Sequence, residues 1–324
     1  MPDRRFEHAA ELAELGLSPP DEETMHFLWQ IVDEGVLGAS RHVELCNELI
    51  LHLVNSGAEG AKRAKLVASF IARTRGHDTP VIGNNLDLLL AGLENLGPND
   101  QRNVLRQRVA ESKDATSKRK TALVDAAVRH LSASSAIMAF DYSSTVAAIL
   151  IEASRARPDL LVVVPESRAI AGGARYLEDF LPHQMNVRFL PDAAIEYGLE
   201  ICDAALFGVE TLRSDGSFLN TIGSRMIARL AGEMGIEVYA ATDIMKLDRR
   251  SYRGHRPEPS IRRYDDVLKA GLNIAGIDDA DTSAPELEVI PARLTTGIMT
   301  EFGVVPPSAI WSLGREIFNR GDMT

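Results

Sequence analysis

Cysteine, aromatic residues and long apolar runs are all scarce in this chain of 324 residues. Two cysteines, Cys46 and Cys202, are too few for a disulfide framework or a structural zinc site. Such sparse use is typical of a reducing compartment, so we expect a cytoplasmic protein. The longest apolar stretches, such as Leu160 to Pro165, are far shorter than the roughly 20 residues that cross a bilayer, so we expect no membrane association.

Positive charge is also in short supply. Lys and Arg total 35 against 46 Asp and Glu, and the net charge of −11 would repel nucleic acid over most of the surface. The exception is the stretch 248–263, which carries six arginines. It could bind RNA or a second phosphate, but its composition favours a solvated loop or a dimer contact. We therefore do not expect a nucleic acid partner.

The first part of the chain has the spacing of helices. A composition of 45% hydrophobic and 25% charged residues is that of a globular protein, and the length suits two domains. From Asp21 to about Leu131 apolar residues recur every three or four positions, which predicts a helical domain over residues 1–131. Gly76, Pro80 and Gly83 interrupt this pattern, so we predict a functional loop over residues 73–85. Residues 101–131 are predicted to form one long helix.

The pattern of apolar residues changes after Ser132. Short apolar runs alternate with helical stretches such as Thr145 to Ala156 and Gly223 to Met234, a pattern typical of buried parallel strands. We predict strands at residues 136–140, 160–164, 187–190, 204–207 and 237–241. The fold class is thus α/β: a helical N-terminal domain, then a Rossmann-like, mostly parallel doubly wound sheet over residues 132–324. Ligands of such sheets bind beyond the carboxyl ends of the strands.

Polar motifs follow these strand ends, and their order resembles a known family. The motifs are Pro165-Glu-Ser-Arg168 with Gly172-Gly173, Gly208-Val-Glu210, Asp215-Gly-Ser-Phe-Leu-Asn-Thr-Ile-Gly-Ser224, and Ile290-Pro291 with Ile298-Met-Thr-Glu-Phe-Gly303. Together they resemble the initiation factor 2B alpha/beta/delta subunit family, which includes methylthioribose-1-phosphate isomerase and ribose-1,5-bisphosphate isomerase. Arg75-Gly76, followed by Pro80 and Ile82-Gly83, is similar to the phosphate-binding loop near the N-terminus of those isomerases.

The resemblance implies a homodimer with a sugar-phosphate pocket between the two domains. Arg75 and Arg168 match the family motifs, and a guanidinium presents a planar fork of donors to phosphate oxygens. Gly76, Gly172 and Gly173 would let backbone N–H groups approach the same anion. Asn220 and Lys246 complete the expected ligand-binding set. No metal and no other cofactor is expected.

The catalytic positions depart from the isomerase pattern. Where the isomerases carry a catalytic cysteine after the first strand, this chain has Asp141, and where they carry a catalytic aspartate it has Glu210. The isomerase pattern Asn-Lys-Ile-Gly-Thr is replaced by Asn220-Thr-Ile-Gly-Ser224, which removes a cation near the ligand.

Two explanations of these departures stay open. In the first, Asp141 and Glu210 form a carboxylate pair in which close like charges raise one pKa, so that one group is an acid and the other a base for aldose–ketose isomerisation. In the second, catalysis is lost, as in the initiation-factor subunits, where Gly-Ala-Glu occurs, and the chain binds a sugar phosphate or nucleotide and signals to a partner. Asp141 could also be only a helix N-cap ahead of Tyr142.

Overall fold

A computed structural model describes residues 11–13, 21–32, 39–57, 59–270 and 277–318. The chain forms two compact units, Met1–Lys118 and Arg119–Thr324. The boundary expected from the sequence, residues 131/132, coincides with the end of the long helix α7 (Pro98–His130), whereas the two units divide within that helix. The last turns of α7 belong to the second unit because Leu123, Val124 and Ala127 are buried in its core.

The first unit is helical, as its apolar spacing predicts. Its helices before α7 include α2 (Glu22–Val32), α3 (Ala39–Asn55), α4 (Gly60–Arg73), α5 (Arg75–Asp78) and α6 (Pro80–Leu90). Buried apolar side chains from α3, α4 and α6, including Leu49, Phe70 and Leu86, form its core.

The prediction of a loop over residues 73–85 is wrong, because this segment is mostly helical. Pro80 takes the first position of α6, where a missing N–H costs nothing. Gly76 and Gly83 serve close packing of α5 against α6: a Cβ on Gly83 would lie 3.0 Å from the Gly76 carbonyl oxygen. These residues therefore allow two short helices to meet closely instead of breaking the helical structure.

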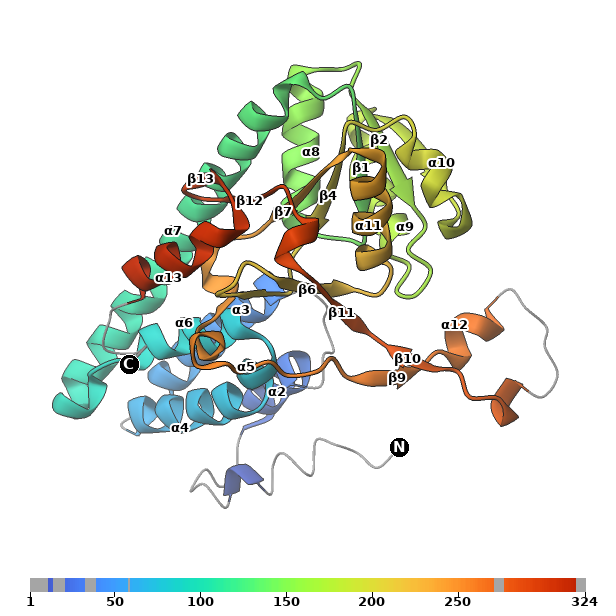
Figure 1. The fold of residues 1–324 in the computed structure, drawn as a ribbon. Helices are drawn as coiled ribbons and strands as arrows, with labels where there is room; N and C mark the ends of the chain where they lie inside the picture. Colours follow the sequence, from blue (N-terminus) through green and yellow to red (C-terminus); the bar gives the residue numbers. More distant parts are fainter. Residues whose placement is uncertain (1–10, 14–20, 33–38, 58, 271–276, 319–324) are drawn as a thin grey trace. The chain divides into compact units, whose positions relative to one another are not determined.

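The second unit contains a seven-stranded sheet in the order β13-β12-β7-β4-β1-β2-β3 (Figure 1). Its strands are β1 (Ala136–Phe140), β2 (Leu161–Pro165), β3 (Asn186–Leu190), β4 (Ala204–Gly208), β7 (Glu237–Ala241), β12 (Gly297–Thr300) and β13 (Gly303–Val305). All neighbouring pairs are parallel except β12 with β13. The predicted fold class, a helical region followed by a mostly parallel sheet, is confirmed, and all five predicted strands are present.

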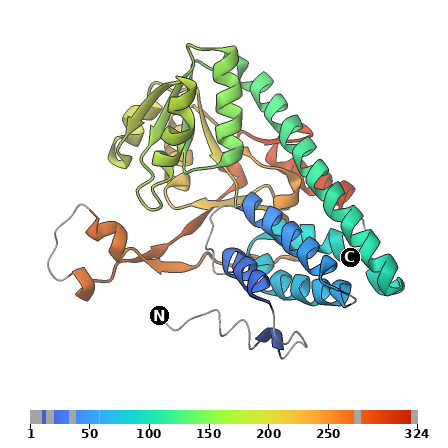
Figure 2. The same cartoon turned by 180° about the vertical axis from the view of Figure 1, so that it is seen from behind.

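Helices cover both faces of this sheet (Figures 1 and 2). The last turns of α7 pack with α8 (Ser144–Ala156) and α9 (Gly172–Phe180) on one face. Helices α10 (Ile195–Leu199) and α11 (Ser224–Met234) pack on the other. The chain leaves β1 toward β2 on one side and later returns to pair β4 on the other. This change of direction makes the carboxyl ends of β1 and β4 the topological switch point, where ligands of doubly wound sheets bind.

A second sheet, which the sequence did not predict, lies next to that edge. It has the order β11-β6-β5-β8. The strands are β5 (Thr211–Arg213), β6 (Phe218–Thr221), β8 (Leu247–Asp248) and β11 (Leu287–Ile290). Strands β9 (Ile261–Arg263) and β10 (Ser283–Pro285) form a separate ribbon, which continues into α12 (Asp265–Lys269) and extends away from both sheets in Figure 1. A last helix, α13 (Ile310–Ile317), follows β13.

Candidate functional site

Asp141 follows β1 in a backbone conformation that few residues adopt. Its φ of 60° lies in the left-handed region, which costs a residue with a Cβ about 1–3 kcal/mol and is most common at functional sites. Its side chain is buried and makes two hydrogen bonds: Oδ2 accepts from Thr221 Oγ1 at 2.6 Å and Oδ1 accepts from the Tyr142 N–H at 2.8 Å.

Burial raises the pKa of Asp141 to about 6. This value already includes a smaller rise from the negative charge of Glu210 and the lowering effects of the two hydrogen bonds and of the Arg175 charge. Asp141 therefore exchanges its proton close to neutral pH, as an acid/base catalyst must.

The alternative role of Asp141 as a helix N-cap is wrong. Ser143 is the N-cap of α8, and its hydroxyl oxygen accepts a hydrogen bond from the Val146 N–H at 3.4 Å. Asp141 lies two residues earlier, outside the helix, and its recorded partners among the described residues are the adjacent N–H of Tyr142 and a hydroxyl from another strand. The Asp141 carboxylate therefore does not cap α8.

The ends of β4 and β7, which are neighbours in the sheet, bring Glu210 and Lys246 to the same edge. Glu210 is half-buried and follows Gly208 and Val209. Lys246 ends the short 3-10 helix η5 (Ile244–Lys246) after β7, and its ammonium group donates to the Val209 carbonyl oxygen. The Lys246 ammonium group therefore bonds the backbone of the residue that precedes Glu210.

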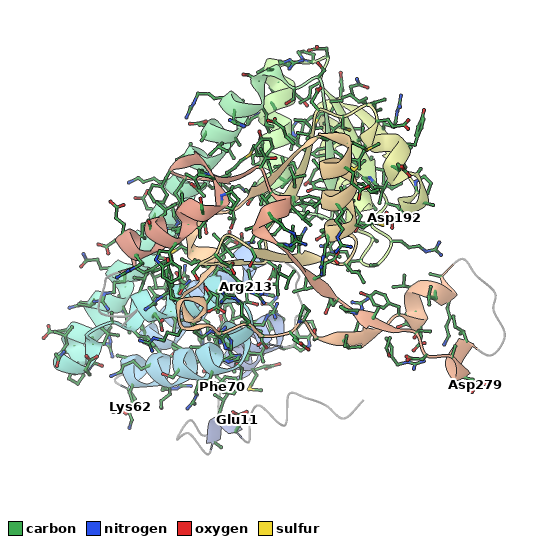
Figure 3. All side chains as sticks on the ribbon, in the orientation of Figure 1. Glu11, Lys62, Phe70, Asp192, Arg213 and Asp279 are labelled. Carbon is green, nitrogen blue, oxygen red and sulfur yellow. The ribbon has the colours of Figure 1, made fainter. Side chains whose placement is uncertain are left out.

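Arg168 lies in the loop that follows β2, and its side chain is exposed. Its guanidinium donates to the Ala270 carbonyl oxygen at 2.7 Å. The loop itself already holds a carboxylate: Asp192, labelled in Figure 3, accepts from the backbone N–H groups of Ser167 and Arg168, both at 2.9 Å. Ser167 and Ala171 have left-handed backbone conformations, so the loop has the tight turns of an anion-binding loop.

Gly172 and Gly173 begin α9, and both serve close packing. A Cβ on Gly172 would lie 2.8 Å from Asp141 Oδ1, and one on Gly173 would lie 2.3 Å from the Pro165 carbonyl oxygen. Their N–H groups donate to the carbonyl oxygens of Ser167 and Glu166. Contact of these N–H groups with a phosphate stays a prediction, whereas the fit of α9 against the ends of β1 and β2 is a direct reason for the two glycines.

Asn220 and the residues of the helical unit complete the predicted set. Asn220 is buried on β6, and its side-chain amide donates to Ser224 Oγ at 3.1 Å. Arg75 is the first residue of α5, and Gly76 is buried beside α6. Because the two residues belong to the first unit, their expected place at a phosphate stays a prediction.

Two residues near Asp141 were not predicted from the sequence as members of the site. Thr221 reaches Asp141 from the second sheet. Arg175 lies on α9, its guanidinium carbon 5.9 Å from the centre of the Tyr142 ring, and its charge lowers the pKa of Asp141. Asp179, one turn further along α9, bonds the Tyr142 hydroxyl at 2.9 Å. Among the described residues no hydrogen bond or ion pair fixes the Arg175 guanidinium.

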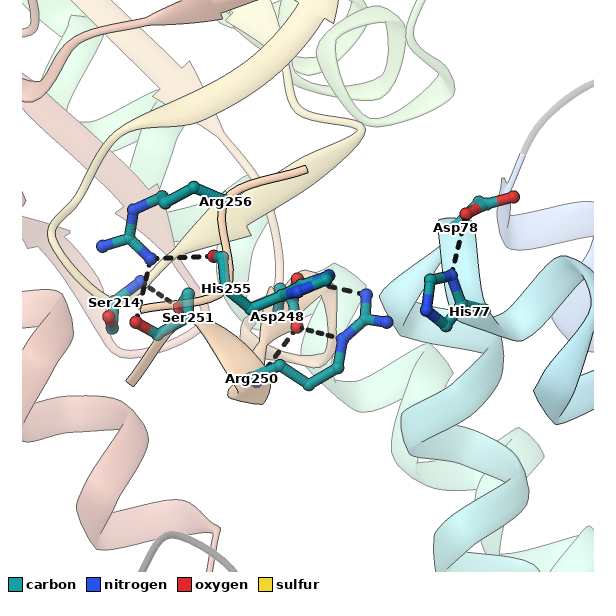
Figure 4. Close-up of polar contacts among 8 residues, drawn as sticks. All are labelled: His77, Asp78, Ser214, Asp248, Arg250, Ser251, His255 and Arg256. Carbon is teal, nitrogen blue, oxygen red and sulfur yellow. Dashed lines mark hydrogen bonds and ion pairs between the residues drawn. The ribbon is translucent and has the colours of Figure 1, made fainter. Parts of the chain in front are cut away.

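The basic stretch 248–263 is largely neutralised by neighbouring carboxylates. Four of its six arginines form ion pairs within the second unit, with nitrogen–oxygen distances from 2.7 to 3.1 Å. The pairs are Arg250 with Asp248, Arg256 with Asp215, Arg262 with Glu286, and Arg263 with Asp265. Figure 4 shows the first of them, together with the bond from Arg256 to the Ser251 carbonyl oxygen. The stretch therefore presents less free positive charge than its composition indicates.

Fold and site together define an α/β protein in which Asp141, Glu210 and Lys246 follow neighbouring strands at the switch point of a mostly parallel sheet. The model of the initiation factor 2 subunit family matches residues 59–307, more than half of the chain, so the chain belongs to this family and the predicted resemblance is confirmed. In the part of the chain that the structure describes, no helix is long and apolar enough to cross a membrane.

Curated relatives of the chain are sugar-phosphate isomerases. The ribose 1,5-bisphosphate isomerase of Haloterrigena turkmenica is 27% identical over 245 residues, which are 72% of this chain and 74% of that enzyme. A putative methylthioribose-1-phosphate isomerase of Pyrococcus horikoshii is 30% identical over 151 residues, 45% of this chain and 41% of that protein. Apart from the match to the Haloterrigena enzyme, the matches to isomerases of this kind span about half of the length of the relative.

Solved structures share the fold at lower identity. The translation initiation factor eIF-2B of Pyrococcus horikoshii OT3 superposes with a TM-score of 0.75 at 18% identity, covering 89% of this chain and 98% of that one. The 5-methylthioribose 1-phosphate isomerase of the same organism also gives 0.75, at 20% identity, covering 91% and 88%. At these identities the likeness shows the fold alone.

Proposed function

We propose that this chain is a sugar-phosphate isomerase that converts a phosphorylated aldose, of the aldose 1-phosphate type, to its ketose by acid/base catalysis. The observation that carries the proposal is the state of Asp141. It is buried at the switch point, its pKa is raised to about 6, and the charge of Glu210 acts on it. A pair of carboxyl groups whose charges interact divides acid and base roles more readily than two independent ones.

The reaction needs four proton transfers, and each carboxyl group of the pair makes two of them. One carboxyl group gives a proton to the ring oxygen as the bond from C1 to that oxygen breaks, while the other accepts the proton from C2, leaving an enol with the phosphate still on C1. The first carboxyl group, now ionised, then takes the proton of the enol hydroxyl at C2 as the carbonyl forms there, and the second returns to C1 the proton that it took from C2. No atom is gained or lost, and each carboxyl group ends as it began.

Cations at the site suit an anionic substrate. We assign Lys246 and Arg175 to the reacting end of the sugar, because Lys246 bonds the carbonyl oxygen of the residue before Glu210 and the Arg175 charge acts on Asp141. Arg168 is assigned to a phosphate, for which its guanidinium would exchange the Ala270 carbonyl oxygen for phosphate oxygens. Arg75, Gly76, Gly172, Gly173 and Asn220 keep their proposed roles around the same ligand.

The names of the relatives suggest the substrate class. Ribose 1,5-bisphosphate and methylthioribose 1-phosphate both carry a phosphate on C1, so the shared chemistry is that of an aldose 1-phosphate. We include in the proposal a homodimer, as the resemblance implies, and a cytoplasmic location, as the scarcity of cysteine favours.

The experiment compares turnover and binding of ribose 1,5-bisphosphate and 5-methylthioribose 1-phosphate by the parent, Asp141→Asn, Glu210→Gln and the double variant. Each single variant should bind as the parent does but lose about 10²–10⁴-fold in kcat. The double variant should be little worse, since groups that act as a unit give non-additive losses. Asp159→Asn, a carboxylate that is exposed and paired with Arg157, is the control for a change of one charge.

The outcomes separate the possible readings. Normal turnover by Asp141→Asn would refute the acid/base role of this residue. A parent protein that binds both sugars and turns over neither would identify a non-catalytic binding protein that signals to a partner, the alternative that the loss of the cysteine leaves open.

A further inference from the structure

The Thr221 hydroxyl makes the shortest contact of the Asp141 side chain. Thr221 ends β6 in the second sheet, and its Oγ1 lies 2.6 Å from Asp141 Oδ2. Both residues are buried, with 5% of Thr221 and 7% of Asp141 exposed. A distance of about 2.5–2.7 Å is typical of a hydroxyl that donates to an ionised carboxylate. Since little water reaches the pair, this bond cannot be replaced by solvent without cost.

Three structural elements fix the plane of the Asp141 carboxylate. Thr221 donates to Oδ2 from β6, and the Tyr142 N–H donates to Oδ1 from the end of β1. On the side of α9, Gly172 lies so close that a Cβ there would be 2.8 Å from Oδ1. The carboxylate is therefore held on both oxygens, and Thr221 is the one side chain recorded among the described residues as a donor to it.

We propose that Thr221 is a positioning residue for Asp141: its hydroxyl holds the carboxylate in one orientation and favours the ionised form. The catalytic meaning of this role rests on the proposed function, because it matters for turnover only if Asp141 transfers a proton. The bond itself and its effect on the titration of Asp141 do not depend on turnover.

The charged and titratable groups around Asp141 set the direction of the effect. Burial and the charge of Glu210, at the end of β4, raise its pKa. Arg175 on α9 lowers it, as do the bonds from Thr221 and from Tyr142. Tyr176, also on α9, has a pKa raised by its own burial and then by the charge of Asp141, so it stays neutral at physiological pH. Removing the Thr221 hydroxyl should therefore raise the pKa of Asp141.

The test uses Thr221→Val, which keeps the shape and removes the hydroxyl, and Thr221→Ser, which keeps the hydroxyl. Titration of the ¹³C-labelled carboxyl groups of the ligand-free protein by NMR, with Asp141→Asn to assign the signal, gives the pKa directly. In Thr221→Val this pKa should rise by about one unit, the tenfold effect of losing a hydrogen bond to a charged group. In Thr221→Ser it should stay within a few tenths of the parent value.

Turnover supplies a second readout. The limb of the kcat profile that reports Asp141 should move to higher pH in Thr221→Val by the same amount, with KM near the parent value, and Thr221→Ser should restore the profile. An unchanged Asp141 titration in Thr221→Val would overturn the proposal, and so would an equal shift in both variants, because the hydroxyl would then not be its cause. If the titration shifts as expected but the parent turns over no sugar phosphate, the positioning role stands and the proposed function fails.

Discussion

Gly172→Ala tests whether the fit of α9 against the end of β1 sets the geometry of Asp141. The added Cβ would lie 2.8 Å from Asp141 Oδ1, 2.8 Å from the Tyr142 nitrogen and 3.2 Å from Asp141 Cα. Two of these neighbours are backbone atoms, so rotation of a side chain cannot relieve the contact. Either the start of α9 moves away from β1, or Asp141 moves with the backbone that carries it.

The magnitude follows from two opposed effects. Forcing a methyl group into a packed contact costs about 1–3 kcal/mol, whereas alanine gains up to about 1 kcal/mol over glycine in a helix, less at its first position. We expect a net loss of about 1–2 kcal/mol in the free energy of unfolding. A change of 1 kcal/mol moves Tm by roughly 2–4 °C in a unit of about 200 residues, so Tm should fall by several degrees.

Urea unfolding followed by circular dichroism measures the stability, and turnover of ribose 1,5-bisphosphate measures the effect on Asp141. Gly232→Ala is the matched control: Gly232 lies on α11, a Cβ there would meet nothing within 4 Å, and the variant should gain about 0.5–1 kcal/mol with normal turnover. If Gly172→Ala were as stable and as active as the parent, the contact with Asp141 would not constrain the site and the reasoning would be refuted.

Three further predictions concern a helix cap, a buried acid and an exposed arginine. Ser143→Ala should lower the free energy of unfolding by about 0.5–1 kcal/mol in a urea titration, the low end for an N-cap, because its bond is long, and Ser143→Asp should restore it. Glu301 has a pKa raised to about 7 by burial and by the charge of Asp243, so its stabilising contribution is present below about pH 4.5 and is lost as pH rises through 7. In urea titrations, the free energy of unfolding of Glu301→Gln relative to that of the parent should therefore rise by about 2 kcal/mol between pH 5 and pH 8. A difference that does not change with pH would contradict this assignment. Arg168→Ala should weaken binding of ribose 1,5-bisphosphate about 10–100-fold by calorimetry without lowering Tm, and unchanged affinity would remove Arg168 from the ligand site.

Most of the second unit could be predicted because buried parallel strands leave a strong pattern. Continuous apolar runs gave β1 and β7 with their observed bounds and the other three predicted strands within a residue or two. The second sheet escaped prediction because its strands have only two to four residues and polar residues among them. The error over residues 73–85 has a different cause: glycine and proline mark turns in most sequences, but Gly76, Pro80 and Gly83 serve packing and a helix start here.

The candidate site could be predicted in part for a related reason. The carboxyl ends of parallel strands meet at one edge of a sheet, so the residues that follow β1, β4 and β7 are expected to lie near one another. Asp141, Glu210 and Lys246 lie near one another as expected. Thr221 and Arg175 reach Asp141 from a strand of the second sheet and from the side of a helix. Their contribution depends on tertiary packing, for which neither spacing nor composition carries a signal.

A second aspartate shows why the surroundings of Asp141 matter more than its hydrogen bonds. Asp265, the first residue of α12, accepts from the Thr282 hydroxyl at 2.7 Å, nearly the distance of the bond between Asp141 and Thr221. Yet a bond from Arg263, with help from Thr282, lowers the pKa of Asp265 to about 2, whereas burial and Glu210 raise that of Asp141 to about 6. A threonine donor is thus compatible with either a permanently charged aspartate or one that titrates near neutral pH. Burial and the sign of the neighbouring charge decide between them, and at the switch point of the sheet both favour proton exchange.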